Sequence, residues 1–305
     1  MKRALRVLGA ALCAAAAACG AEATGPQGAA APARVAGPGS GAALAWAEVL
    51  EHAPDPAVVT DPAWRARLAA TGLPWRVRDR ASGVELLLVP PCAGQRGAGE
   101  DDLEAAADER PAHAVTLVEP FYLGRFEVTQ AEWSRVLGEA PSFFHDPAEA
   151  AERPVEQVAL FRVHEFLAAT GLELPTEGQW ELACRAGDLR PRHGALDDVA
   201  WHRGNSGGTP HAVGARAANA LGFHDLLGNV WEWTRGGYLA DEYERTAGRA
   251  VDARMFLATA PKAVLRGGSW YDPPKRARAS ARYAVERDFV GGHVGFRVAR
   301  ALSQP

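Results

Sequence analysis

The stretch from residue 188 to residue 300 places the strongest constraint on the fold, because its hydrophobic residues follow almost no regular period. It is rich in Gly, Asn, Arg and Trp, and it shows neither the period of an amphipathic helix nor the alternation of a half-buried strand. Long regular elements cannot order such a segment. We therefore expect buried tryptophan anchors, bonds between side chains and backbone, or a metal ion to hold it in place.

The composition of the chain is that of a soluble globular protein. Hydrophobic residues make up 48% of the 305 residues and charged residues 23%, and the formal net charge is -4. No basic excess points to nucleic acid as a partner, and no acidic run points to a solvating tail. The length allows one large domain or two small ones.

Residues 1–19 have the features of a bacterial export signal. Basic residues near the start are followed by an apolar, alanine-rich run over residues 7–18, which is shorter than the roughly 20 residues that span a membrane. Small residues directly precede Cys19, as in lipoprotein signals, although Ala stands where those signals usually have Leu. We expect an exported protein that is lipid-anchored in the cell envelope through Cys19, or secreted if the signal is cleaved without lipidation.

Between this signal and the main domain, the sequence predicts a linker and a short helical segment. Residues 20–41 contain almost no large apolar side chain, so we expect a flexible linker. Residues 42–74 are predicted to be helical in part, with one helix over residues 42–50. A second helix is predicted after Asp61, with Asp as the N-cap and Pro at the first helical position. The globular domain is then expected to span residues 75–302.

The first part of the domain carries strand and loop patterns. Compact apolar runs predict strands over residues 84–89, 114–118 and 121–126. The polar and acidic residues 93–113 between them predict an exposed loop.

Two helices of the domain are predicted from capping boxes, in which a Thr side chain accepts the N3 amide and the N3 side chain accepts the N–H of that Thr. One box joins Thr129 to Glu132, and the other joins Thr176 to Gln179. A third, less regular amphipathic helix is predicted from residue 160, ending at Gly171.

Residues 227–233 read Leu-Gly-Asn-Val-Trp-Glu-Trp and form the most specific motif of the chain. This motif resembles the Gly-Asn-Val-Trp-Glu-Trp signature of the formylglycine-generating enzymes and their relatives. Further segments resemble that family in the family's own order, at residues 126–133, 174–187 and 265–298. The resemblance covers about residues 75–300. It implies an irregular α+β domain with a C-type-lectin-like fold and little regular secondary structure.

The resemblance also implies a calcium site, formed by the backbone oxygens of Leu227, Gly228 and Val230 and by the side chain of Glu232. Such oxygen ligands suit Ca²⁺, and a glycine permits the unusual backbone angle that turns successive carbonyls toward one point. The alternative is that Glu232 is a buried carboxylate bonded to backbone amides or to an arginine, without a metal. The family's other calcium site would begin at Asn205, but its downstream Asp is missing.

Enzymes of this family bind copper through two cysteines just after a Gly-Gly-Ser segment, and they use oxygen to convert a substrate cysteine to formylglycine. The matching positions here hold Asp272 and Ala277, and no cysteine follows Cys184. Thiolates are the soft ligands that stabilise Cu(I), so we do not expect copper. Cys184 and Cys92 could form a disulfide, but we favour unpaired thiols.

The candidate residues for a binding cleft are Ser269, Trp270 and Asp272, in or just after the Gly-Gly-Ser segment, and Arg297 further along the chain. For Ser269 the alternative is a turn residue that bonds the backbone. Tyr271 and Tyr283 would add stacking surfaces for a ligand.

The C-terminal part of the chain is dense in arginine: Arg266, Arg276, Arg278, Arg282, Arg287 and Arg297. These side chains could line a cleft for an anion or a peptide. We favour the alternative, in which most of them pair with acidic residues that include Glu232 and Asp272.

The function we expect is that of a non-catalytic binding or assembly protein of the cell envelope, which holds a peptide, a glycan or an envelope protein. The alternative is an enzyme of altered chemistry that oxidises a peptide or small molecule with a different metal. Convergence of His202, His211 and His224 would favour that enzyme. A true formylglycine-generating oxidase is the least expected, because the copper cysteines are absent.

Overall fold

The computed structural model describes residues 44–302, apart from residues 147, 250, 257 and 259. The predicted signal with Cys19 and the predicted linker lie outside the described residues. Among the residues that are described, no helix has the length and apolar character needed to cross a membrane.

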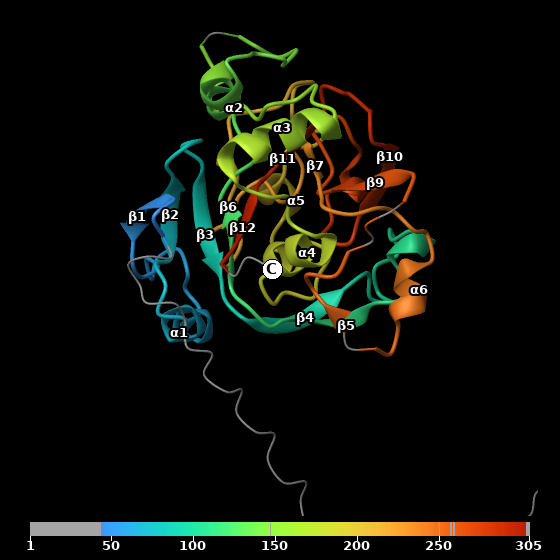
Figure 1. Cartoon of the computed structure of the whole chain (residues 1–305). Coiled ribbons are helices and arrows are strands. Elements are labelled where there is room, and N and C mark those ends of the chain that lie inside the picture. The colour runs from blue at the N-terminus through green and yellow to red at the C-terminus, as the bar shows by residue number, and fades with distance from the viewer. Residues whose placement is uncertain (1–43, 147, 250, 257, 259, 303–305) are drawn as a thin grey trace, which may run out of the picture. The chain divides into compact units, whose positions relative to one another are not determined.

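A five-stranded antiparallel sheet forms one side of the domain, in the order β1-β2-β3-β6-β12 (Figure 1). Its strands are β1 (Ala47–Glu51), β2 (Arg76–Asp79), β3 (Glu85–Val89), β6 (Phe121–Gly124) and β12 (Ala299–Ala301). The predicted strands at 84–89 and 121–126 are confirmed as β3 and β6. Both lie inside the sheet and are almost wholly buried, which explains why their sequences are continuous apolar runs.

The predicted helix over residues 42–50 is wrong in the part that the structure describes, because residues 47–51 form strand β1. This strand pairs with β2 at the edge of the sheet. Local helix propensity is a weak preference, and pairing with a distant strand overrides it. The second predicted helix is confirmed as α1 (Pro62–Ala70), where Ala63 N donates to Asp61 Oδ1 at 2.7 Å.

Two smaller sheets complete the strands. A four-stranded sheet has the order β10-β9-β7-β11, in which β7 and β11 run parallel. A three-stranded sheet has the order β4-β5-β8, and β5 confirms the predicted strand at 114–118. The bounds are β4 Cys92–Arg96, β5 His113–Leu117, β7 Trp231–Trp233, β8 Val251–Asp252, β9 Lys262–Arg266, β10 Arg282–Glu286 and β11 Val294–Phe296.

The predicted exposed loop over residues 93–113 is wrong at its ends, which belong to β4 and β5, and for Asp102 and Glu109, which are buried, whereas the remainder is an irregular and largely exposed segment. Asp102 and Glu109 are buried, and one guanidinium binds both of them. Arg278 NH1 donates to Asp102 Oδ2 at 2.8 Å and to Glu109 Oε2 at 2.7 Å. No local pattern predicts this pairing, because the partner lies far along the chain.

The chain continues after α1 with three main helices: α2 (Gln130–Leu137), α3 (Leu160–Thr170) and α4 (Glu177–Arg185). Both predicted capping boxes are confirmed, at the N-termini of α2 and α4. Helix α3 ends at Gly171, whose φ of 69° is left-handed, as predicted. Short elements fill the rest: α5 Leu196–Val199, α6 Glu242–Thr246 and the 3-10 turns Ala107–Glu109, Ala150–Glu152 and Pro274–Arg276.

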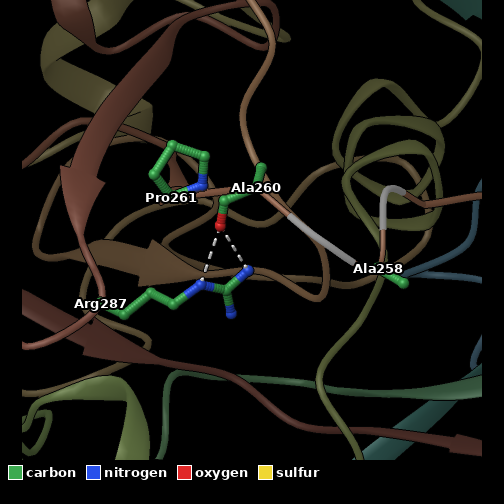
Figure 2. A pocket seen from close by; sticks show the side chains of 4 residues that line it. All are labelled: Ala258, Ala260, Pro261 and Arg287. Atoms are coloured by element: carbon green, nitrogen blue, oxygen red, sulfur yellow. Dashed lines mark hydrogen bonds between the residues drawn. The ribbon is translucent and has the colours of Figure 1, made fainter.

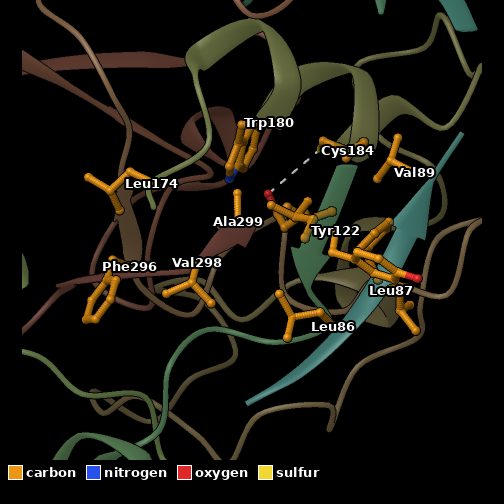
Figure 3. Packing of buried hydrophobic residues seen from close by; sticks show 14 of the residues in the cluster. Leu86, Leu87, Val89, Tyr122, Leu174, Trp180, Cys184, Phe296, Val298 and Ala299 are labelled. Carbon is orange, nitrogen blue, oxygen red and sulfur yellow. Dashed lines mark hydrogen bonds between the residues drawn. The ribbon is translucent and has the colours of Figure 1, made fainter. Parts of the chain in front are cut away.

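Helix α4 lies in the middle of the domain and is buried along its whole length (Figure 1). It contacts β4 and β9. Figure 3 shows Trp180 and Cys184 of α4 packed in one core with residues of β3, β6 and β11. A helix buried on every face must pair its polar side chains internally, and these pairs shape the candidate site described next.

Candidate functional site

The turn that precedes β7 explains the glycine of the Trp-Glu-Trp motif. Gly228 has φ +80°, and a Cβ at this position would overlap the backbone of Trp201. Gly228 N donates to Gly267 O at 2.9 Å, and Asn229 N donates to Trp201 O at 3.0 Å. Only glycine combines this angle with so close a backbone approach. The motif therefore joins the loops around residues 201 and 267.

Glu232, the predicted calcium ligand of β7, is bound by other side chains. Arg297 donates to both of its oxygens, at 2.8 Å from Nε and 2.7 Å from NH2. Trp180 Nε1 donates to Oε2 at 2.7 Å, and the Glu232 side chain is 0% exposed. This is the arrangement of the alternative reading, a buried carboxylate bonded to an arginine.

Calcium binding through the oxygens of Leu227, Gly228, Val230 and Glu232 stays a prediction, and the residues around it do not fit an ion well. A cation on Glu232 would lie beside the Arg297 guanidinium and compete with it for the same oxygens. Two further buried carboxylates, Glu127 and Asp225, have raised pKa values and therefore supply less negative charge to an ion than exposed carboxylates would. Burial raises the pKa of Asp225 to about 6 and, together with Asp225 and Glu232, raises that of Glu127.

Side chains near the other predicted metal positions also have protein partners. Asn205 Oδ1 accepts from His202 N at 2.8 Å, and its amide donates to Ala200 O at 3.0 Å. Among the residues that the structure describes, no three His, Cys, Asp or Glu side chains are grouped to hold a metal. His202, His211 and His224 bind separate partners: Asp197, Ser206 O and Arg216 O. The convergence that would have favoured an enzyme is thus not found there.

Most of the dense arginines are structural. Arg266, Arg278, Arg282 and Arg297 are buried, and each binds at least one carboxylate. The preferred prediction of pairing is therefore confirmed for these four. Arg297 is consequently no surface residue: besides Glu232 it donates to the carbonyls of Gly124 and His224.

The acidic partners, however, were mostly not those expected. Arg282 Nε donates to Glu177 Oε1 at 2.7 Å, and Arg266 and Arg96 also bind the carboxylates of α4. Burial by itself would raise the pKa of Glu177, but Arg282, Arg96 and Arg266 outweigh it and hold that pKa well below its usual value. This network ties α4 to β4, β9 and β10.

Three of the predicted cleft residues lie together in a turn after β9. Ser269 Oγ and Trp231 Nε1 both donate to Asp272 Oδ2, the latter at 2.8 Å. Asp272 N donates back to Ser269 O at 3.0 Å, so Ser269 is a turn residue. Trp270 N donates to Asn229 O at 2.7 Å, which fixes this turn against the Trp-Glu-Trp motif.

Asp272 has no arginine partner, contrary to expectation. Its donors are a hydroxyl and an indole, both neutral, and no cation lies within ion-pair distance of it among the described residues. Arg203 donates from its backbone N–H to the Asp272 carbonyl and from Nε to Tyr271 O, and not to the Asp272 carboxylate.

A series of ring contacts borders this turn, and we call these six residues the aromatic surface: Phe143, Phe144, Trp270, Tyr271, Phe289 and His293. Neighbouring ring centroids lie 5.0 to 5.9 Å apart along the series. Phe143 is 67% exposed and Tyr271 55% exposed. The surface thus gathers side chains from residues 143–144, 270–271 and 289–293.

Sequence reasoning named Trp270, Tyr271 and Tyr283 but missed the other rings. The adjacent Phe143 and Phe144 lie in a polar loop, and this contrast is the signal that could have indicated them. Tyr283 is half-buried and lies 5.4 Å from the ring of Trp231. Trp231 thereby links Tyr283 to Asp272.

Cys92 and Cys184 are both buried and unpaired. Burial raises the pKa of Cys92 to about 11 and that of Cys184 to about 12. Among the described residues, neither thiol forms a hydrogen bond with Asp272. Cys184 Sγ donates instead to Leu226 O at 3.9 Å. The preference for unpaired thiols is confirmed.

Two hollows of the described residues contain none of the predicted cleft residues Ser269, Trp270, Asp272 and Arg297, although Arg287 of the dense arginines lines one of them. Figure 2 shows one of about 500 Å³, lined by Ala258, Ala260, Pro261 and Arg287, in which Arg287 donates twice to Ala260 O at 3.2 Å. The other, of about 390 Å³, lies between α1, β4 and α4 and includes Cys92. Their linings combine no acid, base and nucleophile.

The whole arrangement is that of an irregular α+β domain of the formylglycine-generating type. The chain matches the sulfatase-modifying factor enzyme 1-like domain over residues 76–302, and it therefore belongs to that family. Solved structures agree on the fold: PvdO from Pseudomonas aeruginosa has a TM-score of 0.64 and 24% identity, covering 74% of this chain and 97% of that one.

Two curated relatives are enzymes by name. The hercynine oxygenase of Mycolicibacterium smegmatis is 30% identical over 239 residues, which cover 61% of this chain and 54% of that protein. The formylglycine-generating enzyme of Mycobacterium tuberculosis is 33% identical over 177 residues, which cover 50% of this chain and 58% of that protein. The chain thus spans a little over half the length of these relatives.

Proposed function

We propose that this chain is an exported binding or assembly protein that uses the aromatic surface and Asp272 to hold a partner at the cell envelope. The observation that carries the proposal is the position of Asp272. It stands where the resemblance places a copper cysteine, yet it lies beside six clustered rings, two of which are largely exposed.

The chemistry of the donors supports binding over copper oxidation. A carboxylate is a hard ligand and does not replace a thiolate for Cu(I). The second position holds Ala277, which has no donor side chain and is buried. Exposed aromatic side chains, in contrast, contribute much of the binding energy at protein interfaces.

An enzyme of altered chemistry is the second candidate, and the 30% identity to a hercynine oxygenase favours it. Such an enzyme would need a metal or cofactor held by residues other than Asp272 and the aromatic surface. Fold-level likeness alone does not carry that activity over.

One set of measurements separates the two candidates. We expect the purified protein to contain no stoichiometric copper or iron, and we expect no aldehyde after incubation with a Cys-x-Pro-x-Arg peptide. Bound iron or copper with peptide or small-molecule oxidation would overturn the proposal in favour of the enzyme.

A second experiment tests the surface itself. Chemical cross-linking in the cell envelope should join the wild-type protein to a reproducible partner. The double variant Phe143→Ala/Tyr271→Ala should lose it, and because both rings are exposed we expect the variant to stay folded. Phe161→Ala is the matched control: that ring is 59% exposed but lies on α3. Equal cross-linking by all three proteins would contradict the proposal.

The envelope location is part of the proposal and rests on residues 1–19. Mass measurement of the protein from the membrane fraction should show lipid attached at Cys19, and Cys19→Ser should release the protein from that fraction. A wild-type protein recovered only in soluble form would show that the anchor is absent.

A further inference from the structure

We infer that the Asp272 site accepts a positively charged side chain, Lys or Arg, of a polypeptide partner. This inference rests on the proposed function, because it names the chemistry of the partner that the aromatic surface holds. It follows from the contacts of one carboxylate and from the rings beside it.

The first step is the charge on Asp272. Its Oδ2 accepts from Ser269 and Trp231, which hold the carboxylate in one orientation without neutralising it. Its Oδ1 has no partner among the described residues, and the side chain is half-buried. By contrast, each of the fully buried carboxylates described above binds an arginine or has a raised pKa. Asp272 thus keeps an acceptor available for a charge from outside.

The second step is the wall of rings. Trp231 binds Asp272 directly, and Tyr283 lies against Trp231. Trp270 and Tyr271 are its chain neighbours, and His293 lies 5.8 Å from Tyr271. Trp231 is buried and meets the carboxylate with its N–H edge, so an aromatic face for a cation would come from the partly exposed rings of Trp270, Tyr271 and His293. Aromatic faces attract ammonium and guanidinium groups, so such neighbours favour an organic cation over a small, strongly hydrated ion.

The third step concerns competing cations. Burial lowers the pKa of His293 below its ordinary value, although the negative charge of Asp272 acts in the opposite direction. Arg203 stacks over Tyr271 with its guanidinium carbon 5.2 Å from the ring centroid, and its Nε donates to Tyr271 O. Arg203 thus already occupies one face of Tyr271, but its guanidinium makes no hydrogen bond to the Asp272 carboxylate.

The test uses the indole N–H signals of the full protein in a proton–nitrogen NMR spectrum. The chain has nine tryptophans, so the spectrum stays simple, and Trp231→Phe and Trp270→Phe variants assign the two signals of interest. The probes are acetyl-arginine methylamide, acetyl-lysine methylamide and the citrulline counterpart, which has nearly the shape of arginine without its charge.

We expect both cationic probes to shift the Trp231 and Trp270 signals saturably, whereas citrulline at equal concentration leaves them in place. Asp272→Asn should weaken binding at least roughly tenfold, because one charge-assisted contact is lost. Asn keeps the acceptor for Ser269 and Trp231, and unchanged remaining signals would show that the variant is folded. Asp288→Asn, which removes an exposed charge on the nearby loop, should bind as the wild type does.

Equal shifts with citrulline, or full binding by Asp272→Asn, would overturn this inference. The outcome is separable from that of the proposed function. If the cations fail to bind but Phe143→Ala/Tyr271→Ala still loses its cross-linked partner, only the charge preference is wrong. If the cations bind and cross-linking is unaffected, the proposed function is wrong.

Discussion

Arg297 and Glu232 form a bidentate ion pair at the centre of the domain, with both side chains 0% exposed. Glu232 lies on β7, Arg297 lies between β11 and β12, and Trp180 of α4 donates to the same carboxylate. One carboxylate of the Trp-Glu-Trp motif therefore joins two sheets and the central helix. Breaking this pair leaves a buried charge without its partner.

Glu232→Gln is expected to lower the free energy of unfolding by about 3–5 kcal/mol, because Arg297 would stay buried without a counter-charge. Urea denaturation measures the change. Glu286→Gln is the control, since it breaks the exposed pair with Lys262 and should cost no more than about 1 kcal/mol. Similar losses for the two variants would contradict the structural role of the pair.

Calcium is expected to leave the melting temperature unchanged, because Arg297 and Trp180 already engage the oxygens of Glu232. The measurement compares thermal unfolding in excess calcium and in a calcium chelator. A ligand that bound the folded state would raise the melting temperature in proportion to its saturation. A clear rise that Glu232→Gln removes would establish the calcium site and show that Arg297 yields to the ion.

Gly228→Ala is expected to lower the free energy of unfolding by at least roughly 3 kcal/mol. The alanine would be strained at a left-handed φ, and its Cβ would also overlap the Trp201 backbone. Gly72→Ala separates the two causes. Gly72 also has a left-handed φ, of +68°, but no atom lies within 4 Å of the added Cβ. It should therefore cost only the strain, about 1–2 kcal/mol. Equal costs would show that the approach to Trp201 is not tight.

The Glu109–Arg278 pair is expected to make the domain sensitive to acid. Burial alone would raise the pKa of Glu109, but Arg278 and Ser280 lower it below its ordinary value. A lowered pKa in the folded state stabilises the protein above the unfolded pKa of about 4.3, and that stabilisation is lost as the pH falls through the folded pKa.

The variant Glu109→Gln should therefore be less stable than the wild type at pH 7, by about 1–3 kcal/mol, because Arg278 keeps Asp102 as a second counter-charge. The difference should shrink only below about pH 4.3. Urea denaturation at several pH values measures it. Carboxylates that do not share Arg278, such as Glu177, are common to both proteins and cancel in the difference, whereas Asp102 binds the same guanidinium and contributes to it. A gap that closes already near pH 6 would show that Glu109 does not titrate as described.

Cys92 and Cys184 are expected to resist alkylation in the folded protein. Both thiols are buried, and their raised pKa values keep them protonated at pH 8. Iodoacetamide labelling followed by peptide mapping should modify them only after denaturation, without prior reduction. Labelling that requires a reductant would indicate a disulfide, and rapid labelling of the native protein would indicate an accessible thiolate.

The sequence by itself predicted the parts of the fold whose signals are local. Capping boxes at Thr129 and Thr176 located two helices, and continuous apolar runs located β3 and β6. The ordered motifs indicated the family, which the match over residues 76–302 shows. The absence of cysteines at Asp272 and Ala277 is likewise readable from the sequence.

Tertiary structure alone decided which groups of distant residues meet. Residues 47–51 became a strand because β2 offered an edge, and acidic residues of the expected loop turned inward because Arg278 reached them. Arg297, predicted to line the cleft, instead binds Glu232 in the core. Asp272, expected to have an arginine, was left with neutral donors. The physical reason is the same throughout: hydrophobic period and capping act within a few residues, whereas ion pairs and ring contacts form between segments that only the folded chain brings together.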